Sequence, residues 1–378
     1  MIRRLLTACA AGLLGALAVG APALAHGADA PDGTDYRTEV TVLTPALPGL
    51  TVRAVEAGAR LELTNRTGRT IEVLGYAGEP YLEVRPDGVY ENRNSPATYL
   101  NETLDGDTEP PAGTDPTLAP SWQRIGAEPV ARWHDRRTHW TDETPPEQVR
   151  ADPDRAHRIR DWTVPLRDGV TPIDLRGTLD WLPPPSPGPW WLASLVGALV
   201  LGALGLLPAG RRAGRAVTVA LAGGFALAGA GAVAFAVARE LDAGADGFGG
   251  VVQGLLAGQI WPLLTGLGAL AAGAYALARR PAADFALALS GACLALFAGV
   301  ANAAVFGRSV APVPWPATSA RLLVAAMIVI GVGGTLAGVL RLRAVTPDPL
   351  PAAGGSADLP DDRPRGQRRA AAATGSNP

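Results

Sequence analysis

Histidine occurs at two places where its imidazole could bind a metal ion, and the first is His26. Signal-peptide cleavage after Ala25 would leave His26 as the mature N-terminal residue. Its α-amine and ring Nδ1 could then chelate one Cu(II) ion, because amines and imidazoles are ligands that copper prefers over most competitors. Copper binding at His26 is therefore one candidate chemistry, and an N-terminus without a role is the alternative.

The second place is the block from Trp133 to Trp140, which reads W-H-D-R-R-T-H-W. Its His134, Asp135 and His139 could ligate a metal, with Asp135 either as a ligand or as the acceptor of an imidazole N–H. On a regular strand the two histidines would point to opposite faces, and only a turn at residues 135–137 would bring them together. We favour a structural interpretation, in which both tryptophans pack into the core and His134 and Asp135 cap a hairpin.

The sequence lacks the patterns of common catalytic sites. It has no G-x-S-x-G elbow, no H-E-x-x-H pair and no glycine-rich loop for a nucleotide phosphate. Cys9 precedes the expected cleavage site and Cys293 lies in an apolar span, so the exported part has neither a disulfide nor a thiol nucleophile. We therefore predict that the chain is not an enzyme.

A β domain is the element that must position the block. Residues 26–182 are predicted to form an extracellular, all-β, immunoglobulin-like sandwich, because short strand-like runs are separated by turn sequences. The strict alternation in Tyr36–Thr44 is the clearest of these signals. The other predicted strands are Leu50–Glu56, Leu61–Asn65, Ile71–Gly75, Tyr81–Arg85, Ala131–Trp133, Asp161–Leu166 and Ile173–Trp181.

Five apolar spans follow and predict an all-α bundle of five transmembrane helices over residues 190–343. Each span is apolar over about the 20 residues that a helix needs to cross the hydrocarbon core. No ionisable residue lies in the middle of a span, which argues against an ion or proton pathway. The spans are Trp191–Leu207, Ala216–Ala238, Val251–Ala278, Phe285–Phe306 and Leu322–Leu340.

Arginines predict the orientation of the bundle. Lys and Arg near the ends of spans are retained in the cytoplasm, and the arginines gather after the first, third and fifth spans. The protein is therefore expected in the cell membrane, with its N-terminal domain extracellular and its C-terminal tail cytoplasmic. The orienting residues are Arg211, Arg212, Arg215, Arg279, Arg280, Arg341 and Arg343.

The remaining segments connect or flank these two parts. Residues 1–25 are predicted to be a secretory signal peptide, since two arginines precede an apolar stretch that ends in Ala23-Leu24-Ala25. Residues 183–189 are predicted to be a stiff, proline-rich linker. Residues 344–378, rich in Pro, Ala, Gly and Arg, are predicted to be a disordered cytoplasmic tail.

The predicted extracellular part is acidic, and its charge limits its partners. Residues 31–189 contain 17 Arg against 26 Asp and Glu, a balance that disfavours nucleic acid. The expected partners are the lipid bilayer around the helices and an unknown protein partner at the cell surface.

Short motifs occur across the predicted β domain: Gly75–Tyr81, Pro86–Val89, Asn94–Asn101, Pro120–Trp122 and the block at 133–140. Together they resemble an uncharacterised actinobacterial family of exported multi-pass membrane proteins. The resemblance implies an exported domain on a membrane anchor and no particular activity. The family's block more often reads W-H-D-H-R-x-H-W, and this chain has Arg136 in place of the middle histidine. That departure argues against an obligatory metal site in the block.

These features predict a membrane-tethered extracellular binding or scaffolding protein. Two alternatives stay open. One is a copper-handling protein that uses His26 with residues of the block, and the other is a permease-like bundle for a neutral or lipidic substrate. Because the spans carry no charge at depth, we look for function in the β domain.

Overall fold

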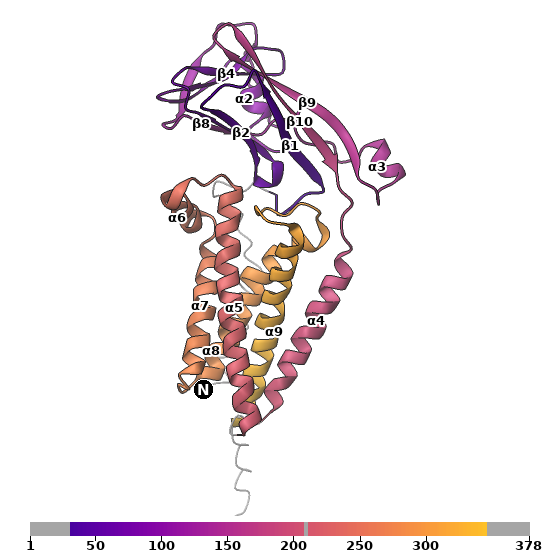
Figure 1. Ribbon diagram of the computed structural model, residues 1–378, viewed down its shortest axis with the longest axis vertical. Helices are drawn as coiled ribbons and strands as arrows, with labels where there is room; N and C mark the ends of the chain where they lie inside the picture. Colours follow the sequence, from indigo (N-terminus) through magenta and orange to yellow (C-terminus); the bar gives the residue numbers. More distant parts are fainter. Residues whose placement is uncertain (1–30, 208–210, 346–378) are drawn as a thin grey trace, which may run out of the picture.

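The computed structural model describes residues 31–207 and 211–345 of the chain. A β-rich domain stands on one end of a bundle of long helices (Figure 1), and its last strand leads directly toward the first helix of the bundle. The predicted signal peptide, His26 and residues 346–378 of the predicted tail lie outside the described residues.

The β domain contains two antiparallel sheets, whose strand orders are β1-β10-β9-β4-β5-β6-β7 and β2-β3-β8. All eight predicted strand runs are strands, and β6 and β7 are additional to them. Two short helices, α2 (Pro96–Leu100) and α3 (Glu147–Ala151), lie in the connections. The strands are β1 (Tyr36–Thr44), β2 (Leu50–Val55), β3 (Arg60–Asn65), β4 (Ile71–Leu74), β5 (Pro80–Arg85), β6 (Gly88–Asn92), β7 (Trp122–Gly126), β8 (Val130–Trp133), β9 (His157–Asp168) and β10 (Thr171–Trp181).

Both sheets bury apolar side chains in one shared core. The smaller sheet contributes Leu61 and Leu63 of β3, and the larger sheet contributes Trp162, Val164 and Leu166 of β9. Along β9 these three residues are buried and the residues between them are not, because successive side chains of a strand point to opposite faces. This shared core makes the N-terminal part a β domain, as predicted.

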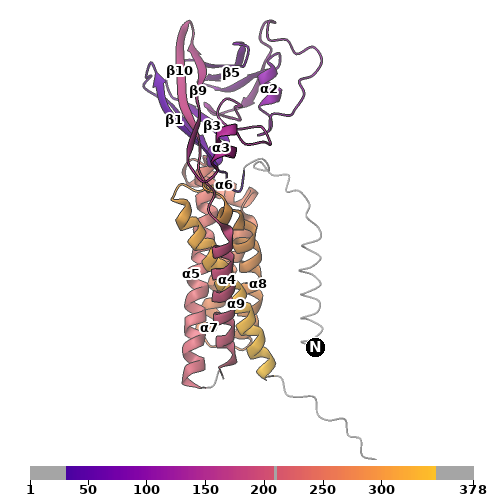
Figure 2. The ribbon, with the colours of Figure 1, turned by 90° about the vertical axis from the view of Figure 1, so that its right-hand side faces the viewer.

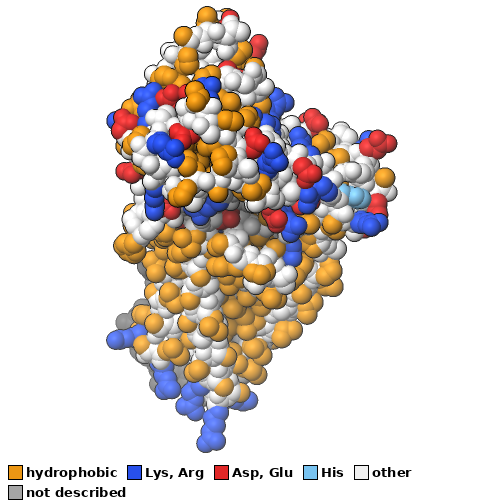
Figure 3. Space-filling view, turned by 45° about the horizontal axis from the view of Figure 1, so that its top comes forward, with side chains coloured by type: hydrophobic (Ala, Val, Ile, Leu, Met, Phe, Trp, Pro, Cys, Tyr) orange, Lys and Arg blue, Asp and Glu red, His pale blue; other side chains and the backbone are white. Residues whose placement is uncertain are grey.

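Five helical spans among the described residues are long and apolar enough to cross a membrane, so the chain is a multi-pass membrane protein. The helices run side by side (Figure 2), with α5 packed on α7 and α9 packed on α4 and α8. Apolar side chains cover the visible flank of the bundle, and basic side chains gather at the end far from the β domain (Figure 3). The spans are α4 (Pro187–Ala203), α5 (Arg212–Asp242), α7 (Ile260–Leu277), α8 (Ala283–Cys293) prolonged to Gly307 by irregular turns, and α9 (Ala317–Val345).

Two predicted boundaries differ from the structure. The third predicted span, Val251–Ala278, is divided into α6 (Gly247–Ala257) and α7. Gly258 lowers the helix propensity at the break, and Pro262 is tolerated because it lies in the first turn of the new helix. The predicted linker 183–189 ends early, since α4 begins at Pro187, where the fixed φ of proline suits a first helical turn.

Direct contacts attach the β domain to the bundle near the start of β1. The buried carboxylate of Asp35 lies 2.7 Å from Nη1 of Arg308 and accepts a hydrogen bond from the backbone N–H of Ser309 at 2.9 Å. Thr34 and Val310 exchange two backbone hydrogen bonds. The β domain is therefore held against the loop that precedes α9.

Candidate binding cavity between the β domain and the helices

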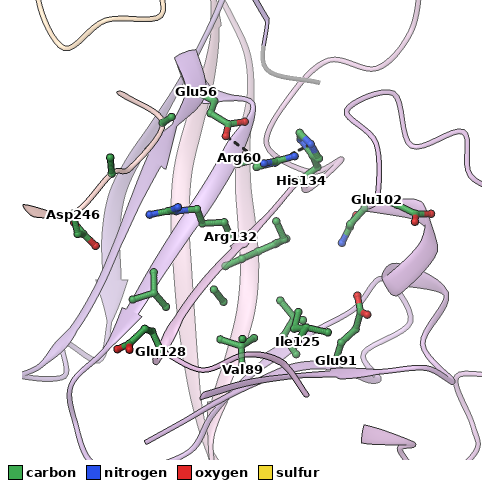
Figure 4. Close-up of a pocket in the computed structure, with 18 of the residues that line it drawn as sticks. Glu56, Arg60, Val89, Glu91, Glu102, Ile125, Glu128, Arg132, His134 and Asp246 are labelled. Carbon is green, nitrogen blue, oxygen red and sulfur yellow. Dashed lines mark hydrogen bonds and ion pairs between the residues drawn. The ribbon is translucent and has the colours of Figure 1, made fainter. Parts of the chain in front are cut away.

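A cavity of about 1000 Å³ lies where the β domain meets the bundle. One wall comes from β6, β7, β8 and the short turn at Glu56–Gly58, and the other comes from the end of α5, the following loop and α6. Figure 4 shows side chains from both walls around the same space. Among the described residues, its acidic lining consists of Glu56, Glu91, Glu102, Glu128, Glu240 and Asp246.

Arginines offset only part of this negative charge. Arg60 lies 3.2 Å from the carboxylate of Glu56, and Arg93 lies 3.3 Å from that of Glu91. A third lining arginine, Arg132, forms its ion pair with Glu62, which does not line the cavity. Within the part of the chain that the structure describes, no ion pair forms at Glu102, Glu128 or Glu240.

A turn held by the helices places Glu56 and Arg60 at the cavity. Glu56 and Ala57 have φ of 56° and 55°, a left-handed conformation that costs a non-glycine residue free energy. The backbone N–H of Ala57 donates to Asp242 of α5 at 2.8 Å, so a contact with the bundle stabilises the turn. Arg60 then reaches the block, where its Nε donates to Nε2 of His134 at 3.0 Å (Figure 4).

His134 uses both ring nitrogens for contacts within the β domain. Its Nε2 accepts from Arg60, so its Nδ1 carries the proton and donates to the carbonyl oxygen of Ala59 at 2.9 Å. The side chain is buried at the cavity wall. These contacts fix the orientation of the ring and link the block to the turn at Glu56–Gly58.

Asp135 is the anchor of the block. Its fully buried carboxylate accepts hydrogen bonds from Nε and Nη2 of Arg137 at 2.8 and 2.7 Å, and from Nε1 of Trp133 at 3.1 Å. Its carbonyl oxygen accepts from the backbone N–H of Thr138 at 2.8 Å and closes a turn. Trp133 is buried in the core of the β domain, and Trp140 is partly buried against that core, as the structural interpretation predicts.

The turn brings the second histidine beside the first, with ring centroids of His134 and His139 6.4 Å apart. Nε2 of His139 lies 2.7 Å from the carbonyl oxygen of Leu104, which can only accept, so Nε2 carries the proton. Burial lowers the pKa of His139. Its Nδ1 is buried and has no hydrogen-bond partner among the described residues.

The arrangement bears on the predicted metal ligands. Arg60 and Ala59 engage His134, and Arg137 and Trp133 engage Asp135. Across residues 31–207 and 211–345, no group of three or more His, Cys, Asp or Glu side chains could hold one metal ion. The block therefore keeps the structural role that we favour, except that His134 and Asp135 do not cap a hairpin, because β8 pairs with β3 and the next strand, β9, belongs to the other sheet. His26 lies outside the described residues, so the N-terminal copper chelate stays a prediction.

Residues that the sequence reasoning missed join the β domain to α5 and α6. Glu62, which is buried, lies 2.7 Å from Nε of Arg53 and 2.6 Å from Nε of Arg132. Arg132 also donates to the carbonyl oxygen of Gly244 in the loop before α6. The alternation of β3 marks Glu62 as a residue of the face away from the core, but its partners are distant in sequence.

The carboxylates of Glu91 and Glu102, on the β-domain wall of the cavity, repel each other electrostatically. Burial raises the pKa of Glu91, Arg93 opposes this rise, and the negative charge of Glu102 adds to it. Glu91 and Val89 share one face of β6, since they are two residues apart on a strand. Ile125 of the paired strand β7 is the exposed apolar residue of this wall, so this part of the cavity combines an apolar side chain with concentrated negative charge.

Several of the sequence motifs meet behind this wall. The hydroxyl of Tyr76 donates to the side-chain oxygen of Asn101 and accepts from the backbone N–H of Arg136 at 3.1 Å. The buried carboxylate of Glu79 accepts from the hydroxyl of Ser95 at 2.6 Å. These polar contacts hold the block, the loop before β5 and helix α2 in one arrangement.

No family model, curated protein or solved structure matches the chain.

Proposed function

We propose that this chain is a membrane-anchored binding protein of the cell surface, and that its ligand occupies the cavity between the β domain and α5–α6. The observation that carries the proposal is the cavity itself, which both parts of the chain form. Its volume of about 1000 Å³ is at the upper end of the range of roughly 300–1,000 Å³ for small-molecule sites. A purely scaffolding role would not require it.

The proposed orientation places this cavity outside the cytoplasm. Basic side chains lie at the end of the bundle far from the β domain (Figure 3), and lysine and arginine at span ends mark the cytoplasmic side. Trp190 and Trp191, at the start of α4, lie at the opposite end, where an aromatic belt is expected. The β domain is then extracellular, and the shared core of its two sheets supports the proposed immunoglobulin-like sandwich.

Glycines of α6 allow a matched test of the cavity. Gly250 lines the cavity, and a Cβ built there meets no atom closer than 3.6 Å, so Gly250→Trp should fill the space. Gly249 is its neighbour but does not line the cavity, and a Cβ there meets nothing within 4 Å. Gly249→Trp is therefore a control with the same change in composition.

The experiment screens the full chain in lipid nanodiscs against a panel of amines, sugars, nucleotides and lipids by thermal shift. We expect at least one compound to stabilise the wild type and the Gly249→Trp variant but not the Gly250→Trp variant. A response that is unchanged by Gly250→Trp would contradict binding in the cavity, and so would the absence of any response.

A further inference from the structure

The cavity contains more negative than positive charge, and its carboxylates are spread over both walls. Arg60, Arg93 and Arg132 are the arginines of its described lining, and each of them already has a carboxylate partner. Glu102 and Glu128 are exposed and have no ion-pair partner among the described residues. A ligand that carries positive charge would meet attractive carboxylates at several separate points.

The spacing of these carboxylates excludes a single metal ion as their common ligand. A divalent cation needs several oxygen ligands within about 2.0–2.6 Å of one point. In the described part of the chain, no three His, Cys, Asp or Glu side chains are grouped closely enough to hold one ion. The positive charges of a suitable ligand must therefore be distributed along a molecule.

Apolar surface lies between the charged points. In Figure 4, Val89 and Ile125 lie between Glu128 on one side and Glu91 on the other. Ile125 of β7 is 54% exposed although it is apolar, whereas Val89 of the paired strand β6 is buried in the core, so Ile125 supplies the apolar surface here. An exposed isoleucine inside a cavity rich in charge suits contact with a hydrocarbon segment of the ligand.

We propose that the ligand is a linear aliphatic polyamine, with its ammonium groups at the carboxylates of Glu102 and Glu128 and a methylene segment on Ile125. This inference rests on the proposed function, because it names the ligand class of the same cavity. The ammonium groups pair with the separate carboxylates, and the methylene groups cover the exposed side chain of Ile125. Binding would release water from Ile125 and add charge-assisted hydrogen bonds at the rim.

The test is a calorimetric titration of spermine into the full chain in phosphatidylcholine nanodiscs, whose lipid has no net charge. The variant is Glu102→Gln with Glu128→Gln. The matched control is Glu109→Gln with Glu143→Gln, which removes the same charge from exposed positions that do not line the cavity. Thermal unfolding confirms that each variant is folded.

We expect saturable binding of spermine to the wild type. Each exposed ion pair contributes roughly 0.2–1 kcal/mol, so loss of both carboxylates should weaken binding by up to about 30-fold. The control pair should leave the affinity within about twofold of the wild type, since the overall field changes little. Magnesium chloride at equal ionic strength should compete no better than sodium chloride.

Other outcomes overturn the inference. No saturable binding of spermine, equal weakening in both double variants, or specific displacement by magnesium would each rule out a polyamine site at these carboxylates. If another compound of the panel stabilises the wild type but not the Gly250→Trp variant, the proposed ligand class is wrong while the proposed binding function stands. If no compound responds, both proposals fall.

Discussion

Replacing the buried carboxylate of Asp135 by an amide should loosen the block and the wall of the cavity. Asp135 accepts three hydrogen bonds from Arg137 and one from Nε1 of Trp133, at 2.7–3.1 Å. Asparagine has the same size but only one acceptor oxygen, and its NH₂ group faces the guanidinium of Arg137. Asp135→Asn thus changes charge and hydrogen bonding while it keeps the packing.

The cost follows from the burial of the pair. Removing one partner of a buried ion pair costs about 3–5 kcal/mol, because the remaining charge is left without compensation. The side chain of Arg137 keeps 20% of its exposure and can be partly hydrated, so we expect the lower end, about 3 kcal/mol. At about 1.4 kcal/mol per factor of ten, local opening should become on the order of 10²-fold more frequent.

Hydrogen exchange of the full chain in nanodiscs, followed by mass spectrometry, measures this opening. Peptides that cover β8 and the block should exchange on the order of 10²-fold faster in Asp135→Asn than in the wild type. The control is Asp142→Asn, an exposed residue beyond the block, which should not change the rate. An increase below about tenfold, or an equal increase in the control, would refute the structural role of Asp135.

Further predictions concern pH, helix packing and the attachment of the β domain. Burial lowers the pKa of His139 below its value of about 6.5 in the unfolded chain, so the unfolded state takes up the proton first and stability falls as the pH drops below about 6.5. The Tm of His139→Gln should fall less between about pH 7 and pH 5, and an identical fall would contradict this. A Cβ at Gly331 would lie 2.6 Å from the backbone nitrogen of Ala295, in the turns that prolong α8, whereas one at Gly223 meets nothing within 4 Å. Gly331→Leu should lower the free energy of unfolding by about 1–3 kcal/mol and so lower the Tm in detergent, while Gly223→Leu should leave the Tm unchanged. Equal Tm values for the two variants would argue against the close helix contact. Asp35→Ala should broaden the distance distribution between spin labels on the β domain and the bundle, and an unchanged distribution would show that other contacts hold the domain.

Local patterns predicted most of the elements. The alternation of Tyr36–Thr44 gives β1 with the same bounds, and apolar runs of sufficient length give the membrane spans. β6 and β7 are not predicted, because neither of their sequences, GVYEN and WQRIG, alternates apolar and polar residues. The third span is predicted as one helix because hydropathy does not register the break at Gly258.

The cavity depends on contacts between residues that are distant in the chain. The sequence singles out His134 and Asp135 as unusual, but a turn at residues 135–137 is only the condition under which His134 would lie near His139, and the structure contains that turn. It does not show that Arg60 engages His134, or that the end of α5 and helix α6 form the opposite wall. Those relations follow from how the β domain docks on the bundle, which no local pattern encodes.

The central claim is that a ligand binds between the β domain and α6, and comparison of two tryptophan variants tests it most directly. The measurement is the affinity of one stabilising compound, spermine first, for the wild type, Gly249→Trp and Gly250→Trp in nanodiscs. We predict that Gly250→Trp abolishes binding, while Gly249→Trp binds as the wild type does. Equal affinity in all three proteins would contradict a binding site in this cavity.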